Sequence, residues 1–116
     1  MGSFSNTEVD LAPAEVYRRM QEEDLVLIDV RESYEWEAGH VPGSRHVEIE
    51  RAASSAPSIP DDRQVAFLCL GGVRSAMVAH GFRAIGIDAW SVVGGFAAWV
   101  DAGLPIEPAD GRVAPH

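Results

Sequence analysis

The residue best suited to covalent chemistry is Cys69, the only cysteine among the 116 residues. It opens a loop with the sequence Cys-Leu-Gly-Gly-Val-Arg, which ends at Arg74. Two adjacent glycines relax the dihedral limits of the backbone, so the N–H groups of this loop can turn toward one centre and bind an anion. Because Arg74 adds a positive charge, a Cys69 thiolate is expected to be stabilised and nucleophilic. The alternative is an inert buried thiol, which is common for free cysteines, but the glycine pair and the arginine favour a nucleophile.

Asp29 and Arg31 are candidates for a supporting role in the same site. They follow the apolar run 25–28, which predicts a buried strand, and the apolar run 65–68 before Cys69 predicts a second one. In a parallel sheet the carboxyl ends of both strands lie at one edge, where ligand sites of open α/β sheets are found. The alternative is structural: Asp29 orients the backbone of the turn and Arg31 pairs with a surface carboxylate.

Predicted helices separate these strands. A first helix is predicted over 12–22, where good helix formers follow a proline. A second begins at Arg74 and is closed by Gly86. Its apolar face is predicted from residues spaced three and four apart: Met77, Val78, Phe82 and Ile85. A further strand over 88–93 and a short helix over 95–101 complete the pattern.

This alternation of strands and helices predicts an α/β domain with a central, mostly parallel sheet covered on both faces. The length of 116 residues fits one domain. We expect the ordered domain to span residues 7–107. Residues 1–6 and the Pro-, Gly- and Ala-rich segment 108–116 are expected to be flexible tails.

Composition excludes several classes of function. The net charge of −9 repels a phosphate backbone, so nucleic acid is not an expected partner. All nine basic residues are arginine, which excludes lysine Schiff-base chemistry and a phosphate-binding loop of the P-loop type. The four histidines show no metal-ligand spacing. No apolar run is long enough to span a membrane and the N-terminus does not resemble a secretory signal, so we expect a cytoplasmic protein.

Four segments together resemble a single-domain rhodanese: IDVRE at 28–32, GHVPGS at 39–44, CLGGVRS at 69–75 and VGGFAAWVDAGLP at 93–105. The resemblance covers nearly the whole chain and implies a rhodanese-like domain with a five-stranded parallel sheet flanked by helices on both faces. It implies that Cys69 carries a persulfide, and that Arg74 and Ser75 are the closing residues of the motif. The loop whose amides cradle the sulfur is implied to comprise Leu70, Gly71, Gly72, Val73 and Arg74.

Such a protein would be a sulfurtransferase without a metal or organic cofactor. Sulfane sulfur would pass from thiosulfate, or from a low-molecular-weight or protein persulfide, through Cys69 to a thiophilic acceptor such as a thiol or cyanide. Active thiosulfate users in the family tend to place a polar or basic residue where this loop has Leu70, Gly71 and Val73. We therefore expect a persulfidated protein, such as a cysteine desulfurase, to meet the apolar loop rim more readily than thiosulfate.

Two alternatives remain. One is a low-activity partner-binding or sulfur-carrier module with little turnover of small molecules. The other is a cysteine phosphatase or arsenate reductase, but proteins of those classes with a similar fold have one more residue between the cysteine and the arginine. Four residues separate Cys69 from Arg74, and this shorter loop suits a sulfur atom better than a tetrahedral phosphate.

Overall fold

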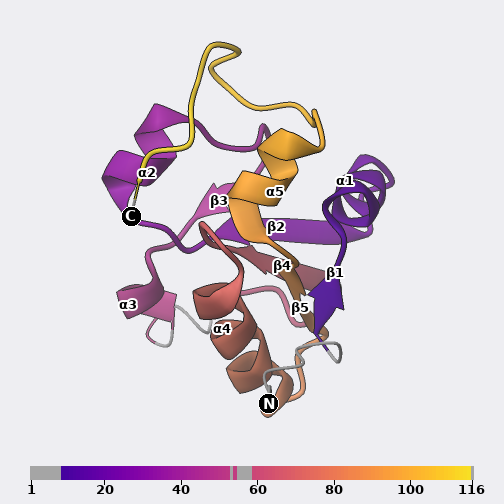
Figure 1. Ribbon diagram of the computed structural model, residues 1–116. Helices are drawn as coiled ribbons and strands as arrows, with labels where there is room; N and C mark the ends of the chain where they lie inside the picture. Colours follow the sequence, from indigo (N-terminus) through magenta and orange to yellow (C-terminus); the bar gives the residue numbers. More distant parts are fainter. Residues whose placement is uncertain (1–8, 53, 55–58, 116) are drawn as a thin grey trace, which may run out of the picture.

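The computed structural model describes residues 9–52, 54 and 59–115 and shows one five-stranded sheet with the strand order β1-β5-β4-β2-β3 (Figure 1). All four strand pairs are parallel. The strands are β1 (Asp10–Leu11), β2 (Leu25–Asp29), β3 (Arg45–His46), β4 (Gln64–Leu68) and β5 (Ala89–Val92). The central strands β2 and β4 have nearly continuous apolar sequences because both of their faces are buried.

Helices cover both faces of this sheet, which confirms the predicted fold class (Figure 1). They are α1 (Pro13–Gln21), α2 (Ser33–Ala38), α3 (Ile49–Ala52), α4 (Val73–Arg83) and α5 (Gly95–Asp101). One core lies between the sheet and α3 and α4, and a second lies between the sheet and α1 and α5. Within the described residues, no helix combines the length and the apolar composition needed to cross a membrane.

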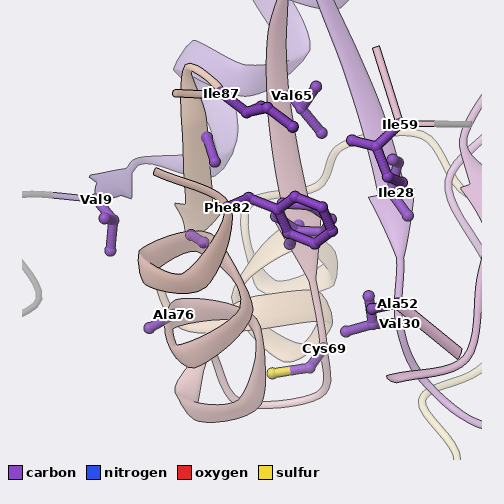
Figure 2. Packing of buried hydrophobic residues seen from close by; sticks show 13 residues of the cluster. Val9, Ile28, Val30, Ala52, Ile59, Val65, Cys69, Ala76, Phe82 and Ile87 are labelled. Atoms are coloured by element: carbon purple, nitrogen blue, oxygen red, sulfur yellow. The ribbon is translucent and has the colours of Figure 1, made fainter. Parts of the chain in front are cut away.

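The alternation of side chains along β4 determines the face on which Cys69 lies. Val65, Phe67 and, one residue beyond the strand, Cys69 belong to the core under α3 and α4. Ala66 and Leu68 belong to the core under α1 and α5. Since successive residues of a strand point to opposite faces, Cys69 continues the row that packs against α4. Figure 2 shows its sulfur at the end of this core, directed toward α4.

The buried face of α4 differs from the predicted one. Phe82 is buried as predicted, but Met77 and Ile85 are 69% and 66% exposed. Besides Phe82, the buried residues of α4 are small: Ser75, Ala76 and Ala79. Small side chains let the helix backbone approach the sheet closely, and this packing outweighs the apolar spacing that favoured Met77. Ile85 lies in the turn after Arg83, where the helix has already ended.

The segment after the last helix also differs from its prediction as a flexible tail over 108–116. Its described part, 108–115, folds back over α2. Its contacts there are a hydrogen bond of 2.8 Å from the Arg112 amide to Ala38 O and one of 3.1 Å from the Tyr34 hydroxyl to Pro115 O, and Ala114 is buried. The domain therefore extends past residue 107. The other predicted tail, 1–6, lies outside the described residues.

Two glycines near the end of α4 allow a direct test of the backbone geometry. A Cβ atom would meet nothing within 4 Å at Gly81 or at Gly86, but Gly86 has a φ of +94°. We expect Gly81→Ala to raise the free energy of unfolding by about 0.5–1 kcal/mol, because alanine loses less backbone entropy in a helix. Gly86→Ala should lower it by about 1 kcal/mol through strain at positive φ. Urea unfolding measures both, and equal effects would contradict the assigned geometry.

Candidate active site

Hydrogen-bond donors surround the Sγ atom of Cys69 at the start of α4. The backbone N–H groups of Gly72 and Ser75 donate to Sγ at 3.1 and 3.4 Å. Gly72 belongs to the predicted amide cradle 70–74, and Ser75 is the last residue of the predicted sulfur-binding loop. The Cys69 side chain is buried, so these donors act in a medium of low dielectric constant. The arrangement favours a negatively charged sulfur at this position.

A pair of serine hydroxyls extends this network. Ser75 Oγ lies 3.4 Å from Cys69 Sγ and 2.8 Å from Ser91 Oγ. When the Ser75 hydroxyl donates to a thiolate, the Ser91 hydroxyl can donate in turn to Ser75 Oγ. Both serines are fully buried, so they are preorganised for this task rather than exchanging with water.

The N-terminus of α5 holds the backbone of the Cys69 loop from the other side. The Phe96 amide donates to Cys69 O at 2.8 Å, and the Ala97 amide donates to Leu70 O at 3.2 Å. This contact requires glycine at position 95, where φ is +64° and a Cβ atom would lie 2.4 Å from Cys69 O. The first turn of α5 thus satisfies its own unpaired N–H groups and fixes the loop.

Arg74 lies at the rim of the loop and has a buried counterion. Its Nη2 atom is 3.7 Å from Oε2 of Glu35, and the side chains are 23% and 0% exposed, respectively. Glu35 also accepts the Glu32 amide at 3.0 Å through Oε1, as part of the capping box of α2. The positive charge predicted to attract an anion is therefore partly compensated within the protein.

Asp29 and Arg31 reach the expected edge of the sheet, but on the face opposite Cys69. Both are fully buried and form a direct ion pair, with Arg31 Nη2 2.7 Å from Asp29 Oδ2. The Arg31 guanidinium also donates to Gly39 O at 2.9 Å and lies 4.1 Å from the ring centroid of Phe96, in the core under α1 and α5. The prediction that Asp29 orients the turn is confirmed, since Oδ1 accepts the Arg31 amide at 3.0 Å. The expectation that Arg31 pairs with a surface carboxylate is wrong.

The rim of the loop is apolar, as the sequence predicts. Leu70 is half-buried, and Val73 is 69% exposed at the first position of α4. Met77, one turn further along α4, is equally exposed. A molecule that approaches Cys69 past this helix therefore meets aliphatic surface next to Arg74.

Three residues of the site are absent from the sequence prediction. Glu35 is the N3 residue of a capping box with Glu32, but a glutamate at the N-cap is not part of the usual sequence pattern, so the signal is weak. Ser91 is a lone hydroxyl in the otherwise apolar strand β5, a pattern that suggests a buried polar contact. Gly95 belongs to a recognised motif, but its contact with Cys69 O depends on tertiary structure.

A cysteine at the carboxyl end of a central parallel strand, facing the first turn of the next helix, defines a class of α/β proteins with a cysteine loop. Comparison with known proteins narrows the class: the model of the rhodanese-like domain family matches residues 12–102. The chain belongs to this family.

Individual relatives and solved structures are similar to this chain over most of its length. A thiosulfate sulfurtransferase GlpE of Actinobacillus succinogenes is 30% identical over 103 residues, which cover 88% of this chain and 93% of that protein. A rhodanese-like domain protein of Staphylococcus aureus has a solved structure with a TM-score of 0.75 and 31% identity, covering 84% of this chain and 96% of its own. The solved structure of a Rhodopseudomonas palustris protein, described as a possible tyrosine phosphatase, has a TM-score of 0.78 and 31% identity. The match covers 88% of this chain and 87% of that protein.

Replacing Gly95 tests whether α5 holds the Cys69 loop. Gly95→Ala places a methyl group against the carbonyl oxygens of Cys69 and Leu70, each 2.4 Å from the ideal Cβ position. We expect the free energy of unfolding to fall by at least about 2 kcal/mol, because backbone must move and φ is positive. The matched control is Gly71→Ala in the same loop, where a Cβ atom meets nothing within 4 Å and stability should change by less than about 0.5 kcal/mol. Denaturant unfolding measures both variants. Equal losses of unfolding free energy would argue against the contact between Gly95 and the Cys69 loop.

Proposed function

We propose that this protein is a sulfurtransferase that carries sulfane sulfur on Cys69. In the first step the Cys69 thiolate attacks the outer sulfur of a donor and forms an S–S bond. The bond between that sulfur and the rest of the donor breaks, and its electron pair leaves with the donor residue, which is sulfite when the donor is thiosulfate. The product is a Cys69 persulfide.

In the second step an acceptor nucleophile, a thiolate or cyanide, attacks the outer sulfur of the persulfide. The electron pair of the S–S bond returns to Cys69, which regenerates the thiolate. Electrons balance over the two steps without an external oxidant, reductant, metal or organic cofactor. The hydrogen bonds to Sγ from Gly72, Ser75 and the Ser75 hydroxyl are the observation that carries this proposal, since they stabilise the sulfur anion that attacks and later leaves.

A second candidate function is a carrier module that exchanges sulfur with a partner protein and turns over small molecules slowly. The apolar rim at Leu70 and Val73 favours it, because aliphatic surface packs against a protein better than against a hydrated dianion. Both functions pass through the same persulfide. They differ in the donor that reaches Cys69, which is a persulfidated protein in the second case.

The persulfide is directly testable because Cys69 is the only thiol of the chain. After incubation with thiosulfate, intact-protein mass spectrometry should show one added sulfur atom on the wild type and none on Cys69→Ser. Cyanide should then remove the added sulfur and release thiocyanate, measured colorimetrically. Loading by a persulfidated cysteine desulfurase, but not by thiosulfate or a low-molecular-weight persulfide, would favour the carrier. Failure of every sulfane donor on folded protein would contradict both functions.

The apolar rim predicts weak use of thiosulfate, which a single substitution should improve. Leu70→Arg adds a positive charge beside the sulfur, and we expect kcat/KM for thiosulfate to rise by roughly threefold or more. Leu70→Gln has a similar length and no charge, so it controls for loss of the leucine. An initial-rate assay of thiocyanate formation compares the three proteins. No gain in Leu70→Arg, or the same gain in Leu70→Gln, would contradict the electrostatic explanation.

A further inference from the structure

The Glu35 carboxylate lies against Arg74, at the rim of the candidate active site. It is fully buried on α2, and its Oε2 atom is 3.7 Å from Arg74 Nη2. Arg74 in turn is the last residue of the Cys69 loop and its only cationic side chain. A buried carboxylate at this distance acts on the arginine through a medium of low dielectric constant, where solvent screens little.

A neighbouring tyrosine shows that these charges share one electrostatic environment. The pKa of Tyr34 is raised overall. Desolvation, Glu35 and Glu32 raise it, and Arg74 offsets part of this rise. The Tyr34 hydroxyl is therefore subject to both the Glu35 carboxylate and the Arg74 guanidinium. The Arg74–Glu35 pair has no net formal charge before any substrate arrives, in a protein whose net charge is −9.

We propose that Glu35 is a specificity-determining residue, which compensates the charge of Arg74 and so selects against small dianionic sulfur donors in favour of donors with less charge at the sulfur. This inference rests on the sulfur transfer proposed above. A thiosulfate ion carries two negative charges beside the sulfur that Cys69 attacks. A persulfide of an organic thiol carries at most one, and its organic part can contact the apolar rim at Val73.

The substitution that isolates the charge is Glu35→Gln. The glutamine Oε1 atom can still accept the Glu32 amide, because glutamine also serves at this position of a capping box. The matched control is Glu37→Gln, which removes the same charge from the same helix at an exposed position, where water screens it. Circular dichroism and thermal unfolding establish that both variants are folded.

Two donors of different charge provide the readout: thiosulfate, a dianion, and benzenethiosulfonate, a monoanion. We expect Glu35→Gln to raise kcat/KM for thiosulfate by about three- to tenfold, and for benzenethiosulfonate by about half as much on a logarithmic scale, because a Coulomb energy is proportional to charge. The gain should shrink as salt is added. Glu37→Gln should change either value by less than about twofold.

Several results would overturn the inference: no gain in Glu35→Gln, an equal gain in Glu37→Gln, or equal gains with both donors. If Glu35→Gln does not fold, the salt dependence of kcat/KM for thiosulfate in the wild type tests the inference instead. Compensation of Arg74 predicts that kcat/KM for thiosulfate stays constant or rises with ionic strength, and a fall would indicate an uncompensated cation. Mass spectrometry separates the two proposals: if both donors load Cys69 but Glu35→Gln shows no gain, only the inference on Glu35 fails.

Discussion

Two helices begin on either side of the loop that carries Cys69, and the geometry of the site depends on their N-terminal amides. The first turn of α4 directs the N–H groups of Gly72 and Ser75 at the sulfur. The first turn of α5 directs those of Phe96 and Ala97 at the loop carbonyls. N–H groups in a first helical turn have no acceptor within their own helix, so the loop supplies hydrogen-bond acceptors that both helices lack. The same bonds that stabilise the fold thus preorganise the surroundings of the Cys69 sulfur.

The period of two along a strand explains which site residues could be predicted from the sequence. The apolar runs before Asp29 and Cys69 predict buried strands, which the structure confirms as β2 and β4, and parallel pairing brings their ends to one edge. The face on which each side chain points depends on the register between the strands. Asp29 is opposite Leu68, so it shares a face with Leu68, whereas Cys69 points to the other face. A shared edge could be predicted, but a shared pocket could not.

Contacts between distant segments account for the rest of the differences. The exposed position of Met77 follows from the close approach of the small residues Ala76 and Ala79 to the sheet, which a helical pattern alone does not reveal, whereas Ile85 lies in the turn after α4. The segment 108–115 is ordered by α2, although its composition is typical of a loop. Both features depend on surfaces that exist only after the sheet has formed.

An uncompensated cation would both stabilise the sulfur anion and attract anions from solvent. Charge compensation separates these two effects. Arg31 and Arg74 each face a buried carboxylate, so neither presents a full positive charge to the solvent. The sulfur is then stabilised mainly by N–H and O–H dipoles, whose field falls off within a few ångströms. Such dipoles stabilise an anion formed in place but do not attract one through solvent, where fixed charge governs encounter. In the proposed sulfur transfer, the site therefore activates Cys69 locally, and contacts at the rim determine which donor reaches it.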